Sequence, residues 1–249
     1  MRFIGLAVLT LLCLLLPSCI EGDEEIFLNA DGSARLKAVY KVPALIFSDK
    51  DAAEMHSKIA KEIGEEDKVN LLTNTVERIN GQQVITIEVE TGDLVKLEDV
   101  MEQSSKSDNK KDSKSEQALD ALLGQFIFRR EGLNVGINRK VDLAPLLEQY
   151  LGERGASMLG TSEFRYTIHF PEAVKSSNAH EVLDGGKTLK WRYKLSECAE
   201  RPIELNIVTP LPLPWWVYTV VGAVSLLMVV VVYRVVRRIW ARRTNVVAT

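Results

Sequence analysis

Residues 24–42 decide the fold, and they read Glu-Glu-Ile-Phe-Leu-Asn-Ala-Asp-Gly-Ser-Ala-Arg-Leu-Lys-Ala-Val-Tyr-Lys-Val. Apolar and polar residues alternate on both sides of Asp31-Gly32, and glycine tolerates the positive φ that a tight turn needs. The stretch therefore predicts a β-hairpin with strands at 24–28 and 34–42, and Pro43 is expected to end the second strand.

The same two signals, alternating apolar and polar residues and a turn that contains glycine, recur in the chain after this hairpin. A second hairpin is predicted at 69–79 and 83–91 around Asn80-Gly81, and another at 126–130 and 133–141. Further predicted elements are helices at 48–63, 93–101, 118–123 and 143–152, and strands at 162–170 and 187–195. The predicted class is α+β: antiparallel hairpins packed with a few helices, in an order that suggests a repeated hairpin–helix unit. A curved or barrel-like sheet is compatible with this order.

The N-terminal segment has the pattern of an export signal. Residues 1–18 contain Arg2, a long apolar run and a small residue at the end. The sequence Leu16-Pro17-Ser18-Cys19 resembles the lipobox of bacterial lipoproteins, in which the cysteine becomes the first residue and carries acyl chains such as palmitate. Cys19 is accordingly the predicted lipidation site. The alternative is an ordinary signal peptide that happens to contain two cysteines.

A second apolar run lies near the C-terminus. Residues 215–233 carry no charge and, at 1.5 Å per residue, are long enough to cross a hydrocarbon core of roughly 30 Å. Five arginines and no acid follow in 234–249, so the positive-inside rule predicts a cytoplasmic tail there. The sequence thus predicts one transmembrane helix at 215–233. A buried core helix is the alternative, and apolar residues on every face disfavour it.

The segment between the two apolar runs is acidic. Residues 20–213 hold 25 basic against all 34 acidic residues, a net charge of −9, which argues against nucleic acid as a partner. We expect an extracytoplasmic α+β domain at 19–197, with a disordered loop at 102–116, where no large apolar residue occurs. An extended arm is expected at 198–214.

No residue is predicted to be catalytic, and neither a metal site nor a cofactor is expected. The histidines at 56, 169 and 180 share no metal-ligand spacing with one another or with Cys198. Acidic neighbours Glu197 and Glu200 disfavour the Cys198 thiolate, which is the reverse of an activated nucleophile. The sequence therefore predicts a protein that is not an enzyme.

Several short motifs together resemble the LppM-type family of bacterial lipoproteins. In chain order they are Cys19, Asp31-Gly32, Phe170-Pro171, Val174, Asn178 and Trp191, followed by the C-terminal apolar run. The resemblance implies an extracytoplasmic α+β domain whose curved sheet can enclose an apolar groove, and a role in binding envelope glycolipids. From the residues themselves, Phe170 and Trp191 are expected to be core residues of adjacent strands, with Asn178 in a turn that bonds its own backbone.

Two functions remain open from the sequence. The first is a non-enzymatic, membrane-anchored envelope lipoprotein of the bacterial cytoplasmic membrane that binds a lipid or glycolipid near the surface. The alternative is a structural or assembly module that recognises another envelope or membrane protein. An apolar cavity between sheet and helices favours lipid binding, whereas a solid core with an exposed apolar patch favours a protein partner.

Overall fold

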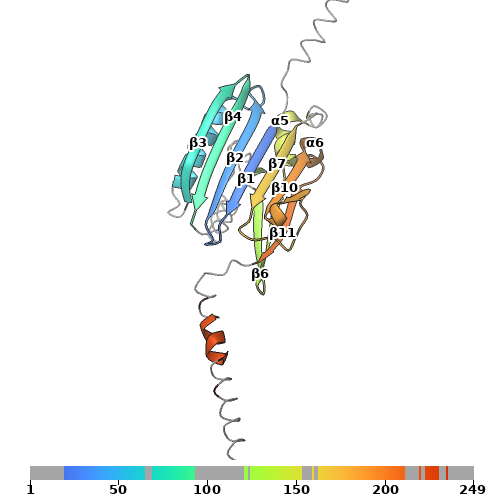
Figure 1. Ribbon diagram of the computed structural model, residues 1–249. Helices are drawn as coiled ribbons and strands as arrows, with labels where there is room; N and C mark the ends of the chain where they lie inside the picture. The colour runs from blue at the N-terminus through green and yellow to red at the C-terminus, as the bar shows by residue number, and fades with distance from the viewer. Residues whose placement is uncertain are drawn as a thin grey trace, which may run out of the picture. The chain divides into compact units, whose positions relative to one another are not determined.

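The computed structural model describes residues 20–64, 69–92, 121–122, 124–152, 159, 162–210, 219, 222–229 and 234 (Figure 1). The chain divides into two compact units, Met1–Leu211 and Pro212–Thr249, and each is described by itself. The first unit contains the sheets, and it is the α+β part of the protein.

Among the residues that the structure describes, seven strands form the larger sheet, in the order β3-β4-β2-β1-β7-β10-β9. Only the neighbours β1 and β7 are parallel, and this pair joins the first half of the chain to the second. The strands are β1 (Glu21–Leu28), β2 (Ala34–Pro43), β3 (Val69–Ile79), β4 (Gln82–Thr91), β7 (Glu163–His169), β9 (Glu181–Leu183) and β10 (Thr188–Lys194).

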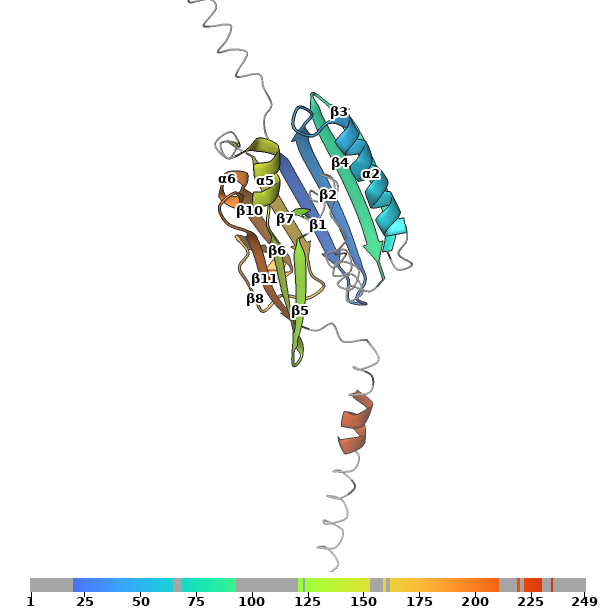
Figure 2. The ribbon, with the colours of Figure 1, turned by 180° about the vertical axis from the view of Figure 1, so that it is seen from behind.

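A smaller antiparallel sheet and the helices lie against one face of the larger sheet (Figure 2). The smaller sheet has the order β5-β6-β11-β8, with β5 (Gln125–Glu131), β6 (Asn134–Val141), β8 (Ser176–Ser177) and β11 (Ile203–Pro210). The helices are α2 (Asp49–Gly64), α5 (Ala144–Leu151) and α6 (Leu195–Cys198), with a 3₁₀ turn, η2 (Asp184–Gly186), before β10.

The two faces of the larger sheet differ in chemistry because successive side chains of a strand point to opposite sides. On β1 and β7 the even-numbered residues from Gly22 to Ile26 and from Phe164 to Ile168 are buried on the covered face. The odd-numbered residues of both strands lie on the open face and include ion-paired Asp23 and Arg165. The core therefore lies entirely on the side of α2, α5 and the smaller sheet.

The predicted hairpins are confirmed. β1 and β2 pair in register around Asp31-Gly32, and Pro43 is the last residue of β2. β3 and β4 meet at Asn80-Gly81, whose φ values of 51° and 81° are those that such a turn requires. The helix predicted at 48–63 is α2, and its first turn is capped by mutual hydrogen bonds between Ser48 and Asp51.

Three expectations differ from the structure. The segment 198–210 is not an arm outside the domain: α6 ends at Cys198, and β11 pairs along its whole length with β6 because its alternate residues from Ile203 to Ile207 are buried. Neither described sheet closes on itself, since β3 and β9 are the edges of the larger one. The repeated hairpin–helix order is also not a spatial repeat, because β5 and β6 form the smaller sheet whereas β7 and β10 join the larger.

The second unit is described only at residues 219, 222–229 and 234, which are helical. Within the part of the chain that the structure describes, no helix has both the length and the apolar character needed to cross a bilayer. The predicted span at 215–233 lies mostly outside that part. So do the predicted signal at 1–18, the lipidation site Cys19, the helix at 93–101, the loop at 102–116, most of the helix at 118–123 and most of the tail at 234–249.

Candidate functional site

An apolar cavity of about 70 Å³ lies between the covered face of the larger sheet and helices α2 and α5, and we call it the α5 cavity. This is several times the roughly 10–15 Å³ that a single water needs, but apolar walls offer a water no partners. A cavity of this kind stays dry and accepts hydrocarbon. Its walls include Ile20, Tyr40, Val42, Ile85 and Phe164 from the sheet side and Met55, Leu146 and Leu147 from the helices.

A second apolar cavity, of about 40 Å³, lies between the larger sheet and the hairpin of β5 and β6, and we call it the β5 cavity. Its walls include Ile26, Leu36 and Ile168 from the larger sheet and Phe126, Phe128 and Ile137 from the smaller. The interior of the domain thus has free apolar space at two places along the same strands.

A buried ion pair lies in the same interior. The carboxylate of Glu24 on β1 pairs with the guanidinium of Arg139 on β6, and neither side chain is more than 3% exposed. The hydroxyl of Tyr40 donates a 2.6 Å hydrogen bond to Glu24, and Arg139 Nη2 donates one of 3.1 Å to the carbonyl of Leu122. These bonds satisfy the two charges, which would otherwise be costly to bury.

Aromatic rings complete the surroundings of this pair. The guanidinium of Arg139 lies 4.8 Å from the ring centre of Phe126 and 5.2 Å from that of Tyr166. Burial, and then the negative charge of Glu24, raises the pKa of Tyr40 and of Tyr166 well above the ordinary tyrosine value. Both hydroxyls therefore stay protonated. The Tyr166 hydroxyl is buried without a hydrogen-bond partner among the described residues.

The electrostatics keep the arginine charged. Burial by itself lowers the pKa of Arg139, but the charge of Glu24, its hydrogen bond and the nearby Tyr166 and Tyr40 together outweigh burial and raise the pKa. The pair is thus a fixed polar element in an apolar interior.

The ion pair lies between the two cavities. Tyr40 and Leu122, which bond its two members, are wall residues of the α5 cavity. Phe126, whose ring faces the guanidinium, is a wall residue of the β5 cavity. Hydrocarbon in one cavity would therefore meet a charged partition before reaching the other.

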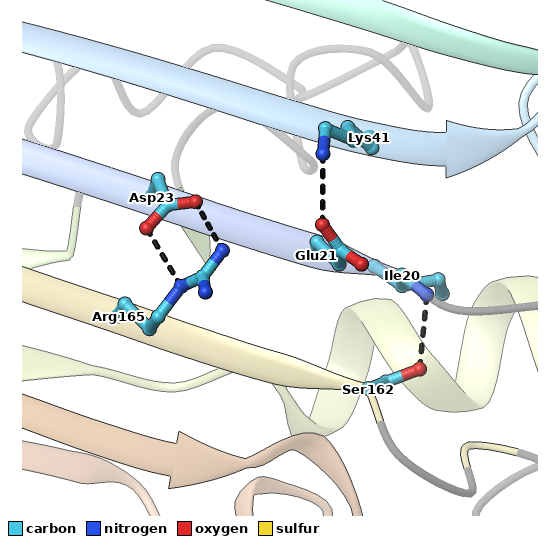
Figure 3. Close-up of polar contacts among 6 residues, drawn as sticks. All are labelled: Ile20, Glu21, Asp23, Lys41, Ser162 and Arg165. Carbon is cyan, nitrogen blue, oxygen red and sulfur yellow. Dashed lines mark hydrogen bonds and ion pairs between the residues drawn. The ribbon is translucent and has the colours of Figure 1, made fainter.

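The beginning of β1 is fastened directly to the domain (Figure 3). The backbone N–H of Ile20 donates a 2.9 Å hydrogen bond to Ser162 Oγ, and Ile20 is itself a wall residue of the α5 cavity. Three residues on, the carboxylate of Asp23 accepts bonds of 2.8 and 2.5 Å from Arg165. Across the sheet, Lys41 Nζ lies 2.9 Å from Glu21 Oε2. Cys19 immediately precedes Ile20, so no linker separates the predicted lipidation site from the folded sheet.

Gly22 shapes the cavity wall beside this attachment. A Cβ at residue 22 would lie 2.4 Å from the ring of Phe164, the residue opposite it on the parallel neighbour β7. Any side chain at that position must displace the ring, and Phe164 is part of the cavity wall. Because Gly22 has no side chain, the ring of Phe164 can pack directly on the backbone of β1.

The residues of the Phe-Pro…Asn…Trp motif are structural. Phe170 and Trp191 are buried, as predicted. The amide of Asn178 does not bond its own turn: its Oδ1 accepts from Trp191 Nε1 at 3.0 Å and from the backbone N–H of Asn206 at 2.9 Å, and its Nδ2 donates to the carbonyl of Glu204 at 2.7 Å. Asn178 therefore joins the larger sheet to β11 of the smaller one.

The three histidines contact different residues. His56 Nε2 lies 3.0 Å from the carbonyl of Asn74, and His180 Nδ1 accepts from the backbone N–H of Arg192. His169 lies on the open face, stacked on Phe27 at 4.4 Å between ring centres. These contacts agree with the interpretation of His169 as a strand residue of the sheet.

Cys198 is a buried free thiol at the end of α6. Burial, and then the charge of Glu197, raises the pKa of the Cys198 thiol to about 11. The sequence correctly indicated a disfavoured thiolate, and burial turns out to be the larger of the two causes.

Sequence reasoning missed Glu24 and Arg139. The signal was present in the alternation, because Glu24 shares its face with Ile26, and Arg139 shares its face with Ile137 and Val141. A charge at an inward strand position must be paired. An inward acid on one strand and an inward base on another could therefore have been predicted to form an ion pair.

The fold and the interior define a two-sheet α+β domain with apolar cavities against one face of the larger sheet. No family model and no curated protein matches this chain. Among solved structures, it is similar to the folded domain of the LppM protein of Mycobacterium tuberculosis, with a TM-score of 0.46 and 14% identity over 78% of this chain and 91% of that one. This solved structure is of the family that the sequence motifs resemble, but the likeness is distant and carries no argument about function.

Proposed function

We propose that this chain is a non-enzymatic, membrane-anchored lipoprotein of the bacterial envelope whose domain holds an acyl chain of a lipid or glycolipid in the α5 cavity. The observation that carries the proposal is the cavity between the sheet and helices α2 and α5, whose exposed lining atoms are apolar although Glu21 and Tyr40 are among its wall residues. Of the two sequence-based functions, this is the one that such a cavity favours.

The size of the cavity limits what enters it. Pockets that enclose a whole small molecule are typically about 300–1,000 Å³, far larger than the 70 Å³ of the α5 cavity. A cavity of this volume admits only the end of a hydrocarbon tail, and the polar headgroup and the rest of the tail stay outside. The Glu24–Arg139 pair then limits how far a tail extends toward the β5 cavity, because burying a methylene chain against it would displace polar contacts.

The location of the cavity supports a membrane ligand. Ile20 is in its wall, and the predicted acylated residue Cys19 is the residue immediately before it in the chain. Acylation there, together with the predicted span at 215–233, holds the domain on the extracytoplasmic side at high effective lipid concentration, with the tail at 234–249 in the cytoplasm.

The interior charges support a binding role over a catalytic one. Glu24 and Arg139 are engaged with each other, with Tyr40 and with Leu122, and their geometry keeps them out of the α5 cavity wall. A general acid or base must instead reach a reacting group.

Native mass spectrometry of the full chain, purified from bacterial membranes in mild detergent, tests the proposal. We expect a bound lipid in the wild type and its loss in Val42→Phe, which extends a wall residue of β2 into the cavity. Val39→Phe is the matched control, since Val39 lies on the same strand but on the open face. Equal lipid retention in all three proteins would rule out the α5 cavity as the site.

A specific observation also favours the alternative function. A shallow groove of about 560 Å³ crosses the smaller sheet, and its walls combine polar residues such as Arg129 and Asn206 with the exposed Ile127. Such a surface suits a protein partner. Loss of a co-purifying membrane protein in Ile127→Asp, with lipid content unchanged, would favour this assembly role.

A further inference from the structure

A polar groove of about 220 Å³ lies on the open face of the larger sheet, which is the face away from the α5 and β5 cavities. A single water needs roughly 10–15 Å³, so the groove has room for a small solute. Its walls come from β1, β7 and β10 and from the segment at the start of β9. Residues that border it include Asp23, Arg165, Thr167, His180, Lys190 and Arg192.

The register of β7 and β10 brings cations together on this face. Arg192 lies directly opposite Arg165, and Lys190 lies opposite Thr167, the next outward residue of β7. Side chains at such opposed positions point to the same face of a sheet, and like charges directly opposite each other repel. The open face therefore carries three neighbouring positive charges at the groove.

Acidic neighbours leave part of this charge without a partner. Asp23 binds Arg165 through Nε at 2.8 Å and Nη2 at 2.5 Å, as Figure 3 shows, and this leaves the N–H groups of Nη1. Glu163 Oε2 lies 3.7 Å from Arg192 Nε, which is too far for a hydrogen bond. Within the described part of the chain, neither Lys190 Nζ nor the Nη atoms of Arg192 make a hydrogen bond or an ion pair. Donors of all three cations are thus available to a solute.

His180 and Thr167 add neutral donors at the same groove. The backbone N–H of Arg192 donates a 3.1 Å hydrogen bond to His180 Nδ1, so the neutral ring carries its proton on Nε2. The backbone N–H of His180 in turn bonds the carbonyl of Lys190 at 2.9 Å, which fixes this wall against β10. Thr167 contributes a hydroxyl from β7.

The groove is locally positive in an acidic domain. Its walls hold three cations and two acids, Asp23 and Glu181, a net charge of +1, whereas residues 20–213 together have a net charge of −9. Asp23 is already bound to Arg165, and Glu181 is the cross-strand partner of Lys190 on β9. An anion is therefore the solute that the remaining donors favour.

We propose that this groove binds a phosphate group through Arg165, Lys190 and Arg192, on the face of the domain opposite the α5 cavity. The N–H groups of a guanidinium match two oxygens of one phosphate, and the ammonium of a lysine adds a point charge. The phosphate is that of a soluble phosphate ester or of a lipid headgroup, since both present the same oxyanion. The site is separate from the acyl-chain site of the proposed function and does not depend on it.

Equilibrium dialysis of the full chain in a phosphate-free, non-ionic detergent, against radiolabelled inorganic phosphate, tests the site. We expect saturable binding in the wild type and a loss of affinity of about tenfold in Lys190→Gln and in Arg192→Gln, because each removes a charged donor. Glu181→Gln removes an opposing charge and should bind more tightly. Lys37→Gln is the matched control, since Lys37 is an exposed cation of the same sheet face that does not border the groove. It should bind as the wild type does.

Competition in the same dialysis distinguishes the two sources of phosphate. Displacement of the label by glycerol phosphate alone indicates a soluble ester, and displacement by phosphatidic acid in the detergent, but not by phosphatidylcholine, indicates a lipid headgroup. Either result supports the site. Absence of saturable binding in the wild type overturns the proposal, as does unchanged affinity in both Lys190→Gln and Arg192→Gln, or equal weakening in Lys37→Gln. Lipid retained by the same variants reports the proposed function separately, because the α5 cavity lies on the other face of the sheet.

Discussion

The carboxylate of Glu24 and the guanidinium of Arg139, 115 residues apart in the chain, form an ion pair in the interior between the two sheets. The pair fixes the smaller sheet against the larger one at a single position, because only one register of β1 opposite β6 brings the charges together. Its cost in desolvation is offset by the hydrogen bonds from Tyr40 and to Leu122.

Removing one member of this pair is expected to be strongly destabilising. Glu24→Gln leaves the Arg139 charge buried and uncompensated, which costs about 3–5 kcal/mol. Thermal unfolding of the full chain in detergent, followed by circular dichroism, should show a lower Tm for Glu24→Gln and for Arg139→Met. The double variant Glu24→Gln/Arg139→Met removes both charges and should recover much of the loss. Additive losses in the double variant would contradict the pairing.

A side chain at Gly22 is expected to disturb the cavity wall. In Gly22→Ala the new methyl meets the Phe164 ring, and the resulting overpacking costs about 1–3 kcal/mol. The matched control is Gly92→Ala, where a Cβ has nothing within 4 Å and φ is not positive. We expect a lower Tm for the first variant and little change for the second. Similar Tm values for the two variants would show that the ring is free to move.

The Cys198 thiol is expected to be inert near neutral pH. Since its pKa is raised to about 11, the thiolate is scarce at pH 8 in the folded protein, whereas a free cysteine has a pKa near 8.5. Because the folded pKa is the higher one, protonated Cys198 stabilises the fold below about pH 8.5, and that contribution is lost as the pH rises toward 11. Reaction with a disulfide reagent should be slow at pH 8 and fast after unfolding in guanidinium chloride. Fast reaction in the native protein at pH 8 would disprove the burial of this thiol.

Local signals in the sequence were sufficient for most elements. The turns at Asp31-Gly32 and Asn80-Gly81 needed only glycine and alternation, and the capping residues Ser48 and Asp51 marked the start of α2. These signals depend only on residues that are close together in the chain, so they can be recognised in a single sequence.

Long-range pairing could not be predicted in the same way. No local pattern indicates that β1 and β7 lie parallel and side by side, since about 140 residues separate them and both have the same alternation. An extended arm was expected at 198–214, but the buried residues Ile203, Leu205 and Ile207 make β11 part of the core. The α5 cavity depends on both pairings, and so its position was beyond sequence reasoning.

Photo-crosslinking tests the central claim, that the α5 cavity holds an acyl chain, most directly. Bacteria expressing the full chain are fed a fatty acid with a diazirine in its chain, irradiated, and the cross-linked peptides are identified by mass spectrometry. We predict adducts on wall residues of the α5 cavity, Met55 and Leu147 among them, that are lost in Val42→Phe and kept in Val39→Phe. Adducts that avoid these residues, or that persist unchanged in Val42→Phe, would contradict the account.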